Sequence, residues 1–274
     1  MKVIFVCGSH PRHCYIAKNL FEANMLAGII IEEREEFTPS PPDGLKNIDR
    51  ENFIRHFKKR NEAENKFFSN VNINAILKET PHLKTDIEQL NGPATIDFIN
   101  KINADFLFSY GCHMLSEEII NAYENRCFNI HGGLSPWFKG VITLYWPFYF
   151  LKPNWAGMTI HRLSTRLDAG DILHHSVPLL EKGDGVHDVA CKAVLKVGKD
   201  IIEILNLIEN GKKIFCVPQK SNGKLFTSGD WTPQHLRLIY NTFSDDIVDC
   251  FLNGEIASPD PDLVNFISAA PVTQ

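Results

Sequence analysis

The sequence lacks the features of disulfide-rich, zinc-binding and dinucleotide-binding proteins. Its seven cysteines are an odd number with no Cys-x-x-Cys pair among them, so neither a disulfide framework nor a zinc ribbon fits. The loop at residues 8–13 follows an apolar run but lacks the Gly-x-Gly-x-x-Gly spacing of a dinucleotide fingerprint. We therefore expect neither a metal site nor an NAD site.

Long hydrophobic runs and an excess of basic residues are also missing. The longest apolar run, residues 141–151, contains a proline and is far shorter than the roughly 20 residues of a membrane helix. The apolar start at residues 2–7 is too short for a signal peptide and is typical of a first strand. The 28 Lys and Arg are outnumbered by 33 Asp and Glu, which argues against a nucleic-acid partner, tRNA included. We expect a cytoplasmic protein that binds neither membranes nor nucleic acid.

Apolar runs alternate with helical patterns along most of the chain. This alternation is typical of an α/β fold, a Rossmann-like, mostly parallel sheet with helices on both faces. We predict a catalytic domain at residues 1–210 and a small C-terminal appendage at 211–274, loose after Pro259. The predicted strands are 2–7, 27–31, 105–109, 126–130, 157–163 and 172–178, and the predicted helices include 50–68, 93–102, 116–123, 141–151 and 185–208.

Asn129 and His131 form the most informative pair in the sequence. They lie two residues apart at the end of a predicted strand, so both side chains point to the same face. Gly132 and Gly133 follow at once and allow the backbone to approach a ligand closely. Asp168, in a later turn, could supply a carboxylate to the same place. An amide for a developing oxyanion, a histidine for the proton and an aspartate beside it suit acyl transfer.

Other polar residues carry weaker signals. Arg12 and His13 follow the first strand, where open α/β sheets bind ligands, so they are candidates for contact with an anionic substrate group. His161 lies on a predicted strand and is interpreted as a core histidine rather than a catalyst. His174 and His175 are adjacent and would face opposite ways on a strand, so they are interpreted as structural.

Three motifs together resemble the folate-dependent formyltransferase family. They are Phe-Asn-Ile-His-Gly at 128–132, Gly-Met-Thr-Ile-His-Arg at 157–162 and Leu-Asp-Ala-Gly-Asp-Ile at 167–172. Within the family they look most like the sugar N-formyltransferases, such as the formyltransferase domain that acts on UDP-4-amino-4-deoxy-arabinose. Two departures from the family pattern, at Gly133–Pro136 and at Phe138–Gly140, lie where substrate or folate would be held.

The resemblance implies a role for each site residue. Asn129 would stabilise the transition state, His131 would carry the proton, and Asp168 would raise the pKa of that histidine. Contacts with the co-substrate N10-formyltetrahydrofolate would fall on His113, Met114, Leu115, Ser164, Thr165, Arg166, Leu167 and Asp168. The substrate would be held by Arg12, His13, Gly132, Gly133 and Lys139.

The function that the resemblance implies is transfer of a formyl group to the amine of a nucleotide-linked amino sugar, in polysaccharide biosynthesis. A methionyl-tRNA formyltransferase would be expected to carry a longer, basic C-terminal domain, whereas residues 211–274 are net acidic. Another formyltetrahydrofolate-dependent transferase and a non-catalytic folate- or nucleotide-binding module are further alternatives. The oligomeric state stays open, with a homodimer as one option.

Overall fold

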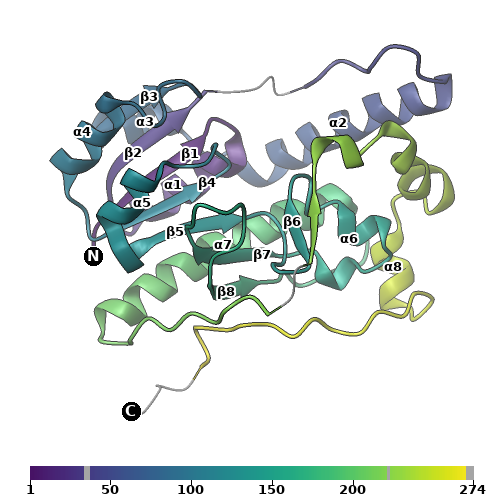
Figure 1. Cartoon of the computed structure of the whole chain (residues 1–274). Helices are drawn as coiled ribbons and strands as arrows, with labels where there is room; N and C mark the ends of the chain where they lie inside the picture. The colour runs from purple at the N-terminus through teal and green to yellow at the C-terminus, as the bar shows by residue number, and fades with distance from the viewer. Residues whose placement is uncertain (34–37, 221–222, 270–274) are drawn as a thin grey trace.

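Seven strands form one sheet in the order β3-β2-β1-β4-β5-β7-β8 (Figure 1). The structure is a computed structural model and describes residues 1–33, 38–220 and 223–269. Two short strands, β6 (Phe138–Gly140) and β9 (Lys224–Phe226), pair separately and in parallel. The strands of the large sheet are β1 (Val3–Gly8), β2 (Leu26–Glu32), β3 (His82–Thr85), β4 (Phe106–Tyr110), β5 (Cys127–His131), β7 (Met158–Arg162) and β8 (Ile172–Ser176).

Helices cover both faces of the large sheet, because its strands are apolar on both sides. Val3 and Phe5 of β1 lie in the core under α1, α2, α3 and α7, whereas Ile4 and Val6 lie in the core under α4 and α5. The predicted α/β fold with a mostly parallel sheet is confirmed. The helices are α1 (Pro11–Glu22), α2 (Asn47–Phe68), α3 (Ile73–Glu79), α4 (Pro93–Ile102), α5 (Glu117–Tyr123), α6 (Trp146–Tyr149), α7 (Val186–Glu209) and α8 (Ile247–Leu252).

Two helices begin where the sequence offers capping groups. The Ser116 hydroxyl accepts the backbone N–H of Ile119 at 3.4 Å and starts α5. The Asp188 carboxylate accepts the N–H of Gly185 at 3.2 Å and starts α7. The helices predicted at 116–123 and 185–208 are observed at 117–123 and 186–209, so each end lies within one residue of the prediction.

One strand next to the β8 edge of the sheet, β7, runs in the opposite direction to the other strands. Strands β1 to β5 of the large sheet are parallel to their neighbours, but β7 runs antiparallel to β5 and β8 runs antiparallel to β7. In the β5–β7 register, Asn129 lies opposite His161 and His131 lies opposite Thr159. The reversal brings the Thr-Ile-His strand beside the Asn-x-His strand.

Two local predictions are wrong. Residues 141–151 do not form one helix: only Trp146–Tyr149 are helical, and Ile142 and Leu151 at the two ends have positive φ angles of 59° and 54°. The chain after Pro259 is not loose up to residue 269. Val264 exchanges hydrogen bonds with His175, the Phe266 N–H donates to His174 at 3.2 Å, and the Phe266 side chain is buried.

The appendage predicted at 211–274 is in contact with the rest of the chain. Its strand β9 pairs with β6, and its last described residues run along the β8 edge of the sheet (Figure 1). A domain boundary near residue 210 stays a prediction. No helix among the described residues is long and apolar enough to cross a membrane.

Candidate active site

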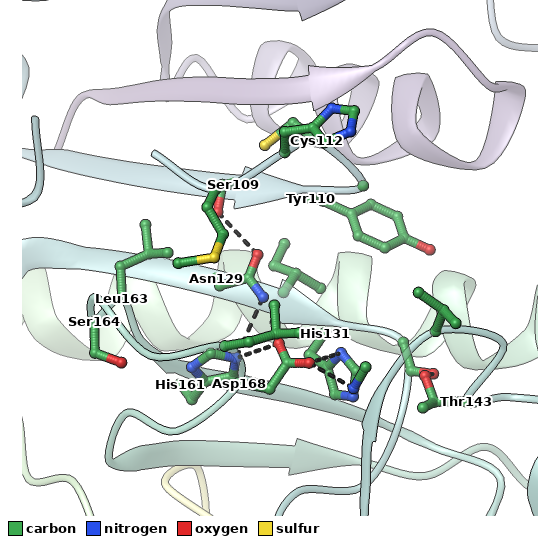
Figure 2. A pocket seen from close by; sticks show the side chains of 18 of the residues that line it. Ser109, Tyr110, Cys112, Asn129, His131, Thr143, His161, Leu163, Ser164 and Asp168 are labelled. Carbon is green, nitrogen blue, oxygen red and sulfur yellow. Dashed lines mark hydrogen bonds and ion pairs between the residues drawn. The ribbon is translucent and has the colours of Figure 1, made fainter. Parts of the chain in front are cut away.

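A cavity of about 390 Å³ opens at the ends of β4 and β5 (Figure 2). Side chains from β4, β5, β7 and the turn after β7 converge on it, and Asn129, His131, His161 and Asp168 face one another there. Its size is within the range of small-molecule sites. The lining residues are Ser109, Tyr110, Gly111, Cys112, His113, Met114, Asn129, Ile130, His131, Gly132, Gly140, Val141, Thr143, His161, Leu163, Ser164, Arg166, Leu167 and Asp168.

The Asn129 amide is held in one orientation by a chain of hydrogen bonds. His161 donates from Nδ1 to the Arg162 carbonyl at 2.8 Å, so its Nε2 acts as an acceptor toward Asn129 Nδ2 at 3.2 Å. The Ser109 hydroxyl donates to Asn129 Oδ1 at 2.9 Å. Both amide atoms are therefore assigned, and one N–H of Asn129 stays available to a ligand in the cavity.

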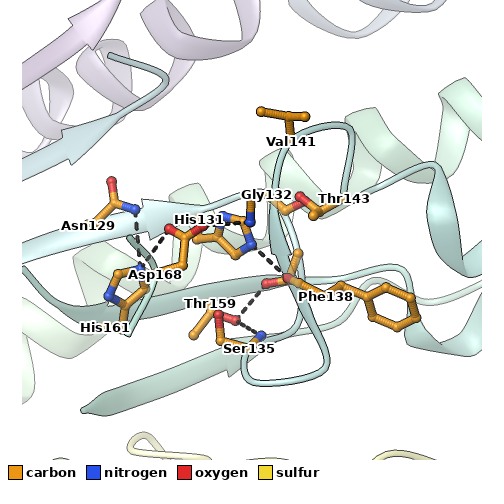
Figure 3. Close-up of polar contacts among 12 residues, drawn as sticks. Asn129, His131, Gly132, Ser135, Phe138, Val141, Thr143, Thr159, His161 and Asp168 are labelled. Carbon is orange, nitrogen blue, oxygen red and sulfur yellow. Dashed lines mark hydrogen bonds and ion pairs between the residues drawn. The ribbon is translucent and has the colours of Figure 1, made fainter. Parts of the chain in front are cut away.

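Asp168 lies between two histidines (Figure 3). Its Oδ2 is 3.4 Å from Nδ1 of His131 and accepts the N–H of Gly140 at 2.8 Å, while its Oδ1 is 3.5 Å from Nε2 of His161. Burial raises the pKa of Asp168, but the neighbouring His131 and His161 rings and the hydrogen bond from the Gly140 N–H outweigh it and lower the pKa to about 2. Asp168 is therefore a carboxylate at neutral pH.

His131 is buried and is fixed from both sides. Its Nε2 donates to the Phe138 carbonyl at 2.8 Å, and its Nδ1 faces Asp168. Burial lowers the pKa of His131 below its ordinary value, and the Asp168 carboxylate and the Phe138 carbonyl only partly offset this. Asp168 thus acts on the histidine in the direction that the resemblance implied, but the net shift is downward.

Two glycines permit this packing. A Cβ on Gly133 would lie 2.6 Å from the Thr143 Cβ and 2.9 Å from Nε2 of His131. A Cβ on Gly170 would lie 1.9 Å from the Arg162 carbonyl oxygen, which no side chain tolerates. The absence of a side chain at Gly133 therefore leaves room for the His131 ring. At Gly170 it lets the turn that carries Asp168 pack against Arg162.

Most of the predicted folate contacts line the cavity. His113, Met114, Ser164, Arg166, Leu167 and Asp168 do so, whereas Thr165 is not among the lining residues and Leu115 is buried in the core with α4 and α5. His113 is anchored: its N–H and its Nδ1 both bind the buried Glu32 carboxylate, at 2.8 and 2.5 Å.

The predicted substrate contacts do not lie together. Gly132 lines the cavity, and Lys139 lies on β6 opposite Leu225. Arg12 binds Glu64 at 2.7 Å and lines a second cavity of about 120 Å³. His13 is buried behind Tyr110, with ring centroids 4.6 Å apart. Gly133 packs against His131 and Thr143 and does not line the cavity.

His161, Ser109 and Thr143 belong to the site although the sequence did not single them out as functional. His161 was interpreted as a core histidine, and it is indeed buried, but it contacts both Asn129 and Asp168. Thr143 donates to the Gly132 carbonyl at 2.5 Å and fixes the loop after β5. A signal for His161 was present in the Thr-Ile-His strand, but only its pairing with β5 assigns it to the site.

The described residues contain no group of three His, Cys, Asp or Glu side chains that could hold a metal ion. The two histidines predicted to be structural have structural partners. His174 contacts Asp200 at 3.2 Å, and His175 donates to the Ser135 carbonyl at 2.8 Å.

Comparison with known proteins gives one family match. The family described as formyl transferase matches residues 57–202, just over half of the chain. The matched range includes β5, β7 and the turn that carries Asp168.

Several solved structures share the fold at low identity. A formyltransferase from Anoxybacillus kamchatkensis, in complex with UDP-4,6-dideoxy-4-formamido-L-AltNAc and tetrahydrofolate, is 19% identical, with a TM-score of 0.50 over 89% of this chain and 95% of its own. An N-formyltransferase from Helicobacter canadensis, in complex with folinic acid and dTDP-3-aminofucose, is 14% identical, with a TM-score of 0.50 over 85% and 73%. A phosphoribosylglycinamide formyltransferase from Anaplasma phagocytophilum is 17% identical, with a TM-score of 0.54 over 84% and 94%. At these identities the likeness establishes the fold alone.

Proposed function

This chain belongs to the formyl transferase family, and on that premise we propose that it transfers the formyl group of N10-formyltetrahydrofolate to the amine of a nucleotide-linked amino sugar. One observation carries the proposal. An oriented amide, Asn129, and a buried histidine–carboxylate pair, His131 and Asp168, line the same cavity. Acyl transfer to an amine needs these groups: a donor for the oxyanion and a carrier for the proton.

The cavity fits the folate co-substrate in chemical character. Two apolar side chains on its wall, Met114 and Leu167, are 48% and 46% exposed and could cover a flat ring. The loop at 111–114 and the turn at 163–168 border it and could bind the ring edge through backbone groups. When bound, N10-formyltetrahydrofolate would supply the formyl carbon: the amine would bond to this carbon, the bond from the carbon to N10 would break, and tetrahydrofolate would leave with the proton of the amine on N10.

Asn129 would stabilise the charge that develops on the formyl oxygen. Its amide is already oriented by Ser109 and His161, so the N–H donor needs no reorganisation during the reaction. An oriented donor of this kind typically contributes about 3 to 4 kcal/mol to transition-state stabilisation.

His131 would take the proton from the attacking amine. Its Nε2 is engaged by the Phe138 carbonyl, which leaves Nδ1, on the Asp168 side, to accept the proton. Burial favours the neutral imidazole, so the base is ready before the reaction, and Asp168 stabilises the imidazolium once it forms.

The second cavity is a candidate for the anionic part of the acceptor. It lies next to the first, because Leu144, which lines it, is 3.7 Å from the Cβ position of Gly132. Arg12 and Arg60 line it together with Glu64, so a phosphate there would share Arg12 with the Glu64 carboxylate. Guanidinium groups suit the phosphates of a nucleotide sugar. The nucleotide sugars bound to the Anoxybacillus and Helicobacter proteins support this acceptor class.

A panel of acceptors tests the proposal. The protein would be incubated with N10-formyltetrahydrofolate and UDP- or dTDP-linked amino sugars, in parallel with glycinamide ribonucleotide and methionyl-charged tRNA, and the products identified by mass spectrometry. We expect a mass increase of one formyl group on a nucleotide sugar. Product on glycinamide ribonucleotide or on tRNA alone would reject the sugar assignment, and formate alone would reject a transferase.

A further inference from the structure

A segment of the C-terminal appendage contacts the turn that carries Asp168. We define the strap as residues 217–220 together with 223–226. Val217 forms two backbone hydrogen bonds with Ile172 of β8, both at 2.8 Å. Strand β9, at the other end of the strap, pairs with β6, and the Phe226 carbonyl accepts the N–H of Val141 at 3.0 Å.

Gln219 is the strap residue that contacts the catalytic turn. Its Nε2 donates to the carbonyl of Asp168 at 2.9 Å and to the carbonyl of Gly170 at 2.8 Å. Both partners are carbonyl oxygens, so the amide nitrogen must face the turn. One side chain thus ties two backbone groups on either side of Ala169.

The turn needs such support because its backbone is unusual. Asp168 has a φ of 46°, in the left-handed region that residues other than glycine adopt uncommonly, although aspartate does so more often than most. Gly170, two residues later, lies so close to the Arg162 carbonyl that no Cβ fits. The orientation of the Asp168 carboxylate depends on the backbone of the turn, and Gln219 binds two carbonyl groups of that backbone directly.

The strap also contacts the strand that carries the second partner of the His131 ring, Phe138. The ring nitrogens of His131 face Asp168 and the Phe138 carbonyl (Figure 3). Gln219 holds the first partner, and β9 holds the second through its pairing with β6, in which Phe138 lies opposite Lys224. Both partners of the histidine are therefore fixed by the appendage.

We propose that Gln219 is a positioning residue that sets the Asp168 carboxylate against His131, which makes the strap part of the catalytic apparatus. The kinetic part of this inference rests on the proposed formyl transfer, whereas its structural part concerns His131 alone and can be measured without turnover.

The test is Gln219→Met, which keeps the length of the side chain and removes the donor. The matched control is Gln234→Met, at an exposed position of the same appendage. Three properties are measured in the full-length protein: the thermal unfolding midpoint, the ¹⁵N chemical shifts of the His131 ring over the pH range in which the protein stays folded, and the separate values of kcat and KM.

In Gln219→Met we expect kcat to fall by about 10- to 100-fold, as misplaced catalytic groups typically cause, with KM for the folate co-substrate little changed. The His131 ring should titrate at lower pH than in the wild type, because the carboxylate that favours its charged form has moved away. Gln234→Met should match the wild type in all three measurements. A residue of merely structural role would lower the unfolding midpoint and leave kcat and the His131 titration unchanged.

A folded Gln219→Met protein with wild-type kcat and wild-type His131 shifts would overturn the proposal, and so would an effect on KM alone. If Gln219→Met does not fold, Gln219→Ala takes its place with the same expectations, since the smaller side chain lets water solvate the two carbonyls. If the wild type forms no formylated product, the proposed function fails, and the His131 shifts alone then decide the role of Gln219.

Discussion

Replacing Asn129 by aspartate isolates the amide donor from the shape of the site. The new carboxylate has the size of the amide and can still accept from Ser109, but the oxygen that replaces Nδ2 cannot donate to Nε2 of His161, which lies 3.2 Å from Nδ2 in the wild type. It can no longer donate to an oxyanion. The size of the side chain is therefore kept, while both N–H donors of the amide, the one toward His161 and the one toward the oxyanion, are removed.

The expected loss follows from the geometry. Removal of one preorganised donor costs 10² to 10³ in kcat, or about 3 to 4 kcal/mol, and the negative charge beside the developing oxyanion places Asn129→Asp at the upper end of that range. KM for N10-formyltetrahydrofolate should change little, because the interaction forms only in the transition state.

The assay is the initial rate of tetrahydrofolate release with saturating acceptor. Asn65→Asp, the same change at an exposed position of α2, is the control and should keep the wild-type rate. A folded Asn129→Asp protein that loses less than about tenfold in kcat would refute the assignment of Asn129 as the oxyanion donor.

Three further predictions follow. The acid limb of the kcat profile should lie below pH 6.5, because burial lowers the pKa of His131, and a limb above that value would contradict the assignment of His131 as base. Burial lowers the pKa of His175 to about 4, so its contribution to stability is complete above pH 6.5 and falls by about 3 kcal/mol as the pH drops toward 4. Urea unfolding should show a weaker pH dependence in His175→Gln, and an equal dependence would refute this. Gly170→Ala should cost about 1–3 kcal/mol and most of the activity, because its Cβ would meet the Arg162 carbonyl, whereas Gly229→Ala should be neutral; equal unfolding free energies would contradict it.

Local patterns predicted the strand that carries Asn129 and His131 because period-two spacing is a property of the chain itself. They did not predict the direction of β7, which is fixed by pairing with distant residues. His161 was therefore interpreted as a core residue, although its cross-strand partner is Asn129. Side-chain burial was predicted correctly, and the contact that gives His161 a role was not.

The last described residues also depend on contacts with distant residues, which local sequence patterns do not predict. Residues 260–269 follow Pro259 and are predicted from the sequence to be loose. They are held instead by backbone groups that bind the ring nitrogens of His174 and His175, at 3.2 and 2.9 Å. Gln219 gave no sequence signal either, because its partners are backbone carbonyls, which have no sequence signature.

Comparison of wild type with His131→Ala tests the central claim most directly. Formylated nucleotide sugar would be quantified by mass spectrometry, and binding of folinic acid, a stable relative of the co-substrate, would be measured in parallel. The account predicts product from the wild type, a loss of at least about 10² in rate in His131→Ala, and folinic acid binding in both proteins. Equal product formation by the two proteins would contradict it.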